Sequence, residues 1–215
     1  MISIQVRMQG ALILALALLG VLVLPSHAAE PGYYIVQNAP AGDTLNLREE
    51  PMGSVLRTFE NGALVASSGK EQTRNSTNWI EVSSGESQGW VAARFVRPAE
   101  PVPLMQSRVP VNGSCGGFEP GWNFSWEGQE AKFSTYDSEM PLTINAVESA
   151  RGFTNPNMIT ASSQAAKVQL ILSERACTAL PVDGFVWGVA NLILSTKEGT
   201  HLFHGCCRPI EGGYK

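Results

Sequence analysis

Several kinds of feature are scarce in this sequence. Its 15 Lys and Arg residues are scattered singly among 19 Asp and Glu residues, which gives a net charge of −4, and they form no basic run interleaved with aromatics. Because nucleic acids are bound by clustered Lys and Arg, we expect no nucleic acid partner. No internal repeat is visible, and apolar stripes at helical spacing are missing apart from a weak candidate at 162–167.

An apolar run of membrane-spanning length is also missing. The longest run, Ala11 to Leu24, has 14 residues, whereas a spanning helix takes about 20. Arg7 precedes this run, Pro25 follows it, and Ser26-His27-Ala28 ends in a small residue, so residues 1–28 read as a secretory signal peptide cleaved after Ala28. We expect a mature chain of net charge −5, since the leader carries only Arg7, located in the periplasm or outside the cell with no membrane partner.

Cysteine is absent from the first half of the chain. The four cysteines are Cys115, Cys177, Cys206 and Cys207, and an even number in an exported chain predicts disulfides. The adjacent Cys206 and Cys207 point to opposite faces if they lie on a strand, so we expect them to pair separately with Cys115 and Cys177. The sequence leaves open which takes which.

The stretch HLFHGCCRP, residues 201–209, also raises the alternatives of a metal site and a reactive thiol. Zinc requires four ligands that converge tetrahedrally, whereas side chains on one strand alternate in direction, so His201 and His204 diverge. We therefore predict no metal and no cofactor. A catalytic alternative takes Cys115 as a nucleophile with one of these histidines as its base.

Prolines mark the organisation of the mature chain. Pro98, Pro101, Pro103 and Pro110 each remove a backbone donor, and such a stretch is typical of a semi-rigid spacer. We therefore predict a linker at 98–110 between a cysteine-free module at 31–97 and a cysteine-containing module at 111–211.

Both modules have the alternating pattern of β-strands. Leu45 and Leu47 alternate with polar residues in the first module, and Trp122, Phe124 and Trp126 share one face in the second. Residues 191–207 read as a hairpin that turns at 197–199. The predicted fold class is all-β: a small SH3-like barrel joined by the proline-containing linker to a disulfide-bonded β-barrel or sandwich.

The first module contains four characteristic stretches, which follow one another in the order DTLNLREEP, SVLRTFENGALV, NWIEV and QGWVAARFV. This order resembles the bacterial SH3-type domain over residues 33–97, which implies about five short strands and the binding of cell-wall peptide. Arg48, Trp79 and Trp90 are candidate ligand contacts. For Arg48 the alternative is a structural bond to a nearby carbonyl or carboxylate, and for the two tryptophans it is a place in the core. The expected inward residues are Leu45, Leu47, Val55, Leu64, Val65, Ile80, Val82, Val91 and Phe95.

The second module opens with CGGFEPGW, continues through ERACTALPVDG and closes with LFHGCCR. It resembles a family of uncharacterised exported bacterial domains, and that resemblance implies fold and location but no activity. Glu119 and Trp122 are candidate contacts for sugar or peptide, with a core role as the alternative for Trp122.

The function predicted from these features is that of an exported, non-catalytic protein of the cell envelope. Its expected partner is peptidoglycan peptide or an envelope protein, bound through the SH3-type module. The alternatives are a peptidoglycan hydrolase based on cysteine or carboxylates and a proteinaceous inhibitor of an envelope enzyme. A serine with a lysine three residues later, in Ser67-Ser68-Gly69-Lys70, is interpreted as a loop.

Overall fold

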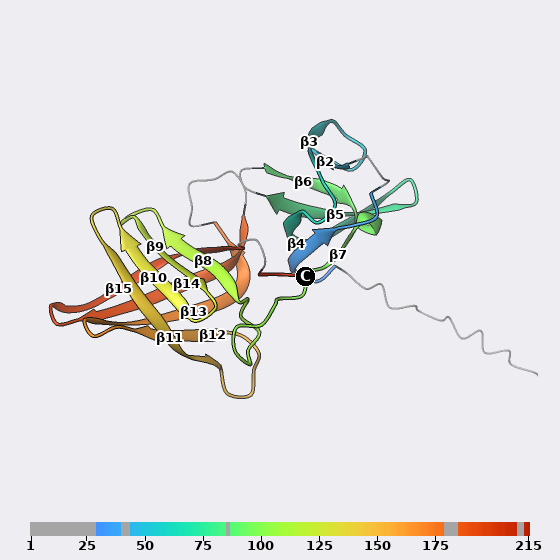
Figure 1. Ribbon diagram of the computed structural model, residues 1–215. Helices are drawn as coiled ribbons and strands as arrows, with labels where there is room; N and C mark the ends of the chain where they lie inside the picture. Colours follow the sequence, from blue (N-terminus) through green and yellow to red (C-terminus); the bar gives the residue numbers. More distant parts are fainter. Residues whose placement is uncertain (1–28, 40–43, 85–86, 179–184, 210–212) are drawn as a thin grey trace, which may run out of the picture.

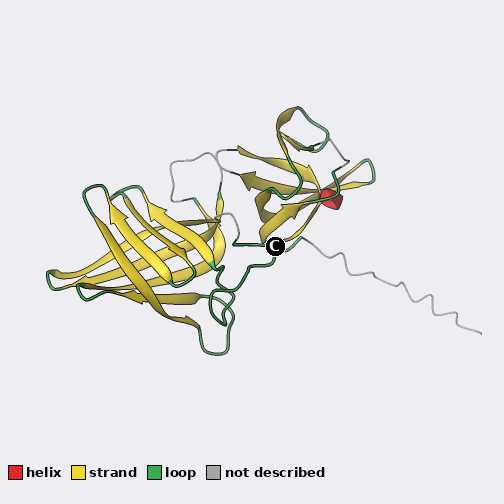
Figure 2. Ribbon diagram, in the orientation of Figure 1, coloured by secondary structure: helices red, strands yellow, loops and turns green. Residues whose placement is uncertain are grey.

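The structure, a computed structural model, describes residues 29–39, 44–84, 87–178, 185–209 and 213–215. The predicted signal peptide lies outside these residues. Within them the chain forms fifteen β-strands and one turn of 3₁₀ helix, so the all-β prediction is confirmed (Figures 1 and 2). None of the helical structure in the described part of the chain is long and apolar enough to cross a membrane.

The first module is one antiparallel sheet of seven strands in the order β3-β2-β6-β5-β4-β1-β7. About five strands were expected, and that number is wrong because β1 pairs with both β4 and β7 and thereby extends the sheet past β4. The elements are β1 (Gly32–Val36), β2 (Leu45–Arg48), β3 (Val55–Phe59), β4 (Leu64–Arg74), β5 (Thr77–Ser84), β6 (Ser87–Ala92), the 3₁₀ turn (Ala93–Phe95) and β7 (Val96–Pro98).

Most of the residues expected to point inward form the core of this module. Leu47, Val82 and Val91 are fully buried in one cluster. Val55 and Leu64 are the exceptions. Leu64 is half-buried outside this cluster, and Val55 is 47% exposed because β3 is an end strand of the sheet. An edge strand has only one neighbouring strand to cover its side chains. The alternation of apolar and polar residues in such a short strand therefore does not predict which of its side chains are buried.

The second module is a closed barrel of eight antiparallel strands in the order β10-β11-β12-β13-β14-β15-β8-β9. Of the two predicted alternatives, a barrel or a sandwich, the module is therefore the barrel. Trp122, Phe124 and Trp126 lie inside it, as their alternation predicted. The strands are β8 (Asn112–Gly117), β9 (Trp122–Glu127), β10 (Glu130–Thr135), β11 (Glu139–Ser149), β12 (Asn157–Ser162), β13 (Ala166–Cys177), β14 (Val186–Thr196) and β15 (Gly199–Pro209).

No helix forms at the weak candidate 162–167. These residues end β12, make the connection to β13 and begin that strand. The pairing of Ser162 with Lys167 shows that the connection is a tight hairpin, and a hairpin leaves no room for a helical turn.

The predicted hairpin at the end of the barrel is confirmed. Thr196 of β14 pairs with Gly199 of β15 around a two-residue turn. On β15 the two adjacent cysteines face opposite sides: Cys207 joins the barrel core, whereas Cys206 packs with Cys177 in a separate cluster. The disulfides are Cys115–Cys207 and Cys177–Cys206, so the prediction of two separate bridges is confirmed and the open pairing is resolved.

Part of the proline-rich stretch 98–110, which was predicted to be a semi-rigid spacer, packs against the barrel. Pro98 still belongs to β7. Leu104 and Val109, which are 1% and 2% exposed, belong to the barrel core, and the Leu104 amide donates to the Val109 carbonyl at 2.7 Å. The prolines end the sheet as predicted, but the apolar residues between them cover one end of the barrel.

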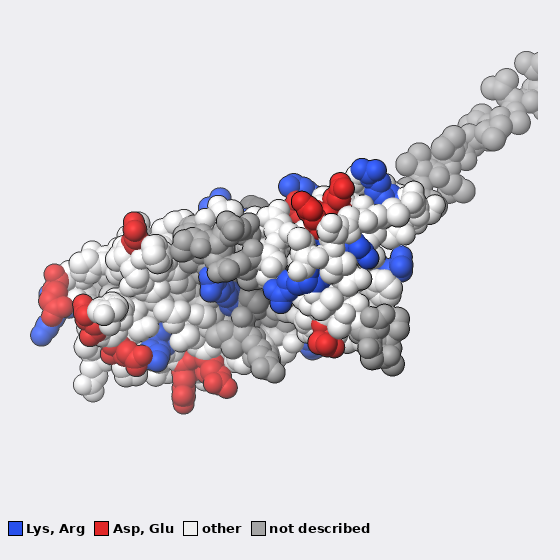
Figure 3. Space-filling view, turned by 90° about the horizontal axis from the view of Figure 1, so that it is seen from above, with Lys and Arg blue, Asp and Glu red and all other residues white. Residues whose placement is uncertain are grey.

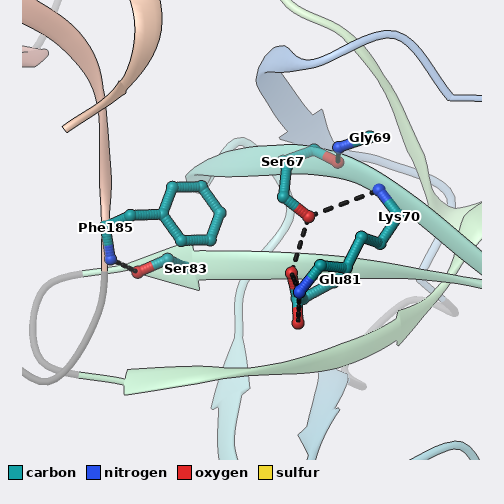
Figure 4. A network of polar contacts seen from close by, with 7 residues as sticks. Ser67, Gly69, Lys70, Glu81, Ser83 and Phe185 are labelled. Atoms are coloured by element: carbon teal, nitrogen blue, oxygen red, sulfur yellow. Dashed lines mark hydrogen bonds and ion pairs between the residues drawn. The ribbon is translucent and has the colours of Figure 1, made fainter. Parts of the chain in front are cut away.

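The two modules contact each other along several segments. Near the C-terminus, which lies between the modules in Figure 1, Lys215 and Glu100 exchange two backbone hydrogen bonds of 2.8 and 2.9 Å. The Phe185 amide donates to Ser83 Oγ at 3.1 Å across the junction (Figure 4). On the face shown in Figure 3, Lys and Arg side chains are dispersed among Asp and Glu over both modules.

Candidate binding groove of the first module

A groove of about 230 Å³ lies on the first module. It begins on β2, where Asn46 and Arg48 alternate with the buried Leu45 and Leu47 and therefore face away from the core. The short helical turn after β6 contributes further residues. The described lining residues are Ala39, Thr44, Leu45, Asn46, Arg48, Trp79, Ala92, Arg94 and Phe95.

Arg48 is fixed by the turn that follows its own strand. Its Nη1 donates to the carbonyl of Gly53 at 2.7 Å, which is the structural carbonyl contact that the sequence offered as one alternative. Two backbone bonds tighten the same turn, from Glu49 to Ser54 and from Gly53 to Glu50. A guanidinium has five N–H donors, so this contact orients Arg48 in the groove wall without using up its donors.

Trp79 of β5 also lines the groove. Its side chain is only 8% exposed, and its indole Nε1 is the one buried side-chain nitrogen or oxygen in the described part of the chain that has no hydrogen-bond partner. Leaving a buried donor unsatisfied costs about 1–3 kcal/mol. An acceptor atom that reached this nitrogen would remove that cost.

Arg94 and Phe95 complete the groove, and sequence reasoning did not find them as site residues. The Arg94 guanidinium lies over the Phe95 ring, with 4.6 Å from its carbon to the ring centroid. Among the described lining residues the charged side chains are Arg48 and Arg94, both positive. A groove with two guanidiniums and an unpaired indole N–H suits a carboxylate or a carbonyl-rich chain.

Trp90, the third candidate of this module, lies outside the groove lining. It is half-buried and pairs in register with Arg48 on one side and Glu81 on the other. Its neighbour Gly89 lets β6 approach β2 closely, because a Cβ there would overlap the carbonyl oxygen of Arg48. The close approach of β6 to β2 positions Arg48 and so supports the groove.

Glu119 and Trp122 do not form one surface site. Glu119 is exposed in the turn between β8 and β9. Trp122 is 4% exposed, its Nε1 donates to the His204 carbonyl at 3.2 Å, and its ring packs against Phe133 and Phe203. Alternation along β9 sends Trp122 into the barrel together with Phe124, and the turn carries Glu119 away from it.

The cysteine cluster offers neither a thiolate nor a metal site in the described structure. Cys115 is bonded to Cys207, so its sulfur is not available as a nucleophile. His204 contacts Asn191 through Nδ1 at 3.0 Å. No group of three or more His, Cys, Asp or Glu side chains with metal-binding geometry occurs among the residues described.

The serine–lysine stretch is not a loop, as was expected, but a bulge within β4. The register between β4 and β5 shifts between Ser67 and Glu71. Ser68 Oγ donates to Glu81 at 2.6 Å and Lys70 pairs with the same carboxylate at 3.1 Å (Figure 4). Burial disfavours the charged form of Glu81, but hydrogen bonds from Ser68, Lys70 and Gln88 outweigh it and lower the pKa of Glu81. The bulged segment thus supplies two partners, Ser68 and Lys70, to the buried Glu81 carboxylate.

A larger cavity of about 570 Å³ lies between the modules and was not foreseen. Tyr33 of β1 and Tyr214 near the C-terminus contact each other in its wall, with ring centroids 5.1 Å apart. Burial raises the pKa of both phenols. The Tyr33 hydroxyl accepts from the Trp187 amide at 3.3 Å and lies 3.5 Å from the Cys207 carbonyl. Tyr33 is more than 150 positions away in the sequence from Trp187, Cys207 and Tyr214, and no local pattern predicts that they meet.

No protein-family model, curated protein or solved structure matches this chain.

Proposed function

We propose that the protein is an exported, non-catalytic component of the cell envelope that binds peptidoglycan peptide through an SH3-type first module. The two disulfides support the exported location, because such bonds persist in oxidising compartments. The leader at 1–28 supports passage to the periplasm or the exterior.

The observation that carries the proposal is a groove lined by Arg48, Arg94 and Trp79, the last of which has a buried indole N–H without a partner. Wall peptides contain carboxylates and backbone carbonyls, which would accept hydrogen bonds from the Trp79 indole and from the two guanidiniums. The groove volume of about 230 Å³ is smaller than the 300–1,000 Å³ of drug-sized sites. It accommodates a side chain or a chain terminus rather than a whole glycan strand.

The test is sedimentation of the full mature chain with purified peptidoglycan, followed by titration with soluble stem peptides whose carboxylates are free or amidated. Trp79→Phe removes the N–H but keeps an aromatic ring. We expect it to weaken binding by about 5–10-fold, since one hydrogen bond contributes about 1 kcal/mol. Arg94→Gln removes a charge from an exposed position, and we expect it to weaken binding of the free carboxylate more than that of the amide.

Arg74→Gln is the matched control, because Arg74 is exposed at the end of β4 and lies outside the groove lining. Its affinity should equal that of the wild type. Recovery of the wild-type chain only in the unbound fraction would refute wall binding. Equal losses in Arg74→Gln and Arg94→Gln would show that the groove is not the site.

A further inference from the structure

The chain just after the predicted cleavage point is built into the first module. Ala29 packs against the core cluster of that module, and the Glu30 carbonyl accepts a hydrogen bond of 2.8 Å from the Tyr34 hydroxyl. Gly69 makes this packing possible: its φ is +80°, and a Cβ there would lie 2.9 Å from both the Ala29 carbonyl oxygen and the Pro31 ring. The bulge in β4 thus leaves space for residues 29–31.

The backbone nitrogen of Ala29 lies on a carboxylate. It donates to Glu71 Oε1 at 2.6 Å, from the same bulged strand that accommodates Pro31. None of the ion pairs formed within the described residues involves Glu30 or Glu71. Burial, followed by the negative charges of Glu30 and Glu71, raises the pKa of the neighbouring Tyr34. The Glu71 carboxylate therefore contacts this nitrogen, and within the described part of the chain it forms no ion pair with a Lys or Arg side chain.

We propose that the α-ammonium of Ala29, which the predicted cleavage after Ala28 creates, forms an ion pair with Glu71 that anchors the start of the mature chain. This inference rests on the export included in the proposed function. In the cleavage, water adds across the amide: the carboxylate stays on residue 28, and the amine stays on Ala29 and takes up a proton at neutral pH. The donor that contacts Glu71 thereby changes from a neutral amide to a cation.

This change strengthens the contact, because hydrogen bonds between ionised partners are shorter and stronger than those of a neutral amide. Cleavage one or two residues earlier would move the ammonium away from Glu71, and later cleavage would remove the Ala29 packing. Ala29, Glu30 and Glu71 also line the cavity between the modules. The anchored terminus therefore forms part of that cavity wall.

The first experiment expresses the full chain with its own leader and determines the N-terminus of the exported protein by sequencing and intact mass. We expect it to begin at Ala29. The second measures the rate at which an amine-selective reagent labels Ala29 as the pH is raised, in the wild type and in Glu71→Gln. Since the carboxylate favours the protonated amine, labelling in the wild type should begin at a higher pH than in Glu71→Gln.

Glu60→Gln is the matched control, because Glu60 is an exposed carboxylate of the same module, and it should label as the wild type does. A thermal shift gives an independent readout. Glu71→Gln should lower the melting temperature of the processed chain more than that of a chain that keeps extra residues before Ala29.

A different first residue, or identical labelling curves for wild type and Glu71→Gln, would overturn the inference. A chain that begins at Ala29 with the expected shift but does not bind peptidoglycan refutes the proposed ligand and leaves the anchored terminus standing.

Discussion

Replacing both cysteines of one disulfide with alanine is expected to destabilise the barrel by an amount set by the length of chain that the bridge closes. The Cys115–Cys207 bridge joins residues 92 positions apart, and the Cys177–Cys206 bridge joins residues 29 apart. On the chain-entropy model these loops correspond to about 4.6 and about 3.6 kcal/mol. Both values are large against the 5–15 kcal/mol that typical domains have in total.

The two loops are nested, so each bridge costs less to lose while the other is in place, but the difference between the two losses is unchanged. With the inner Cys177–Cys206 bridge in place, the outer bridge closes an effective loop of roughly two-thirds its nominal length, so its loss costs about 4.3 kcal/mol. The inner bridge lies wholly within the outer one, and closure of the thermodynamic cycle gives about 3.3 kcal/mol for its loss with the outer bridge in place. The outer pair should therefore remain the more important of the two by about 1 kcal/mol.

The assay is urea unfolding monitored by hydrogen exchange of the backbone amides of β14 and β15. These amides report on the barrel and not on the first module. Reduction of the wild type is the control, because free thiols keep nearly the side-chain volume that alanine removes. The reasoning is refuted if loss of the outer bridge costs less than about 1 kcal/mol, or less than loss of the inner one.

Gly205→Ala should lower the free energy of unfolding of the barrel by about 1–3 kcal/mol, because the added Cβ would overlap the Gly116 carbonyl of β8. At Gly121 there is space for a Cβ, so Gly121→Ala is the control and should have the melting temperature of the wild type. Burial raises the pKa of Tyr33, so its contribution to stability is complete below the ordinary value of 10 and is lost as the pH rises further; Tyr33→Phe should flatten alkaline unfolding curves. The pKa of Glu81 is lowered, so its contribution is present above 4.5 and lost as the pH falls through the folded value; Glu81→Gln should reduce the acid dependence of the melting temperature.

The sequence predicted the local features of the barrel because short-range patterns determine them. Alternation placed Trp122 inside and sent Cys206 and Cys207 to opposite faces, and the turn residues located the β14–β15 hairpin. The pairing of the cysteines stayed open since it depends on which strands are neighbours. That order comes from closure of the barrel, which brings Cys115 of β8 directly opposite Cys207 of β15.

The sequence did not predict the contacts that join distant segments. Prolines correctly marked the end of the sheet, but nothing local indicated that Leu104 and Val109 would cover the barrel end. The pairing of Lys215 with Glu100 likewise has no short-range signal. For the groove, residue chemistry identified Arg48 and Trp79, whereas Arg94 was missed because its place depends on the short turn after β6.

The candidate groove and the contact with the barrel use different parts of the first half of the chain. The groove is lined from β2, β5 and the turn after β6, whereas the hydrogen bonds to the barrel and the C-terminal segment come from Tyr33, Ser83, Arg97 and Glu100. No described residue belongs to both sets. A ligand in the groove therefore does not compete with the barrel for the same side chains, and the two modules need not separate for binding. It follows that changes at the junction, such as Tyr33→Phe, should alter stability while leaving the affinity for peptidoglycan unchanged.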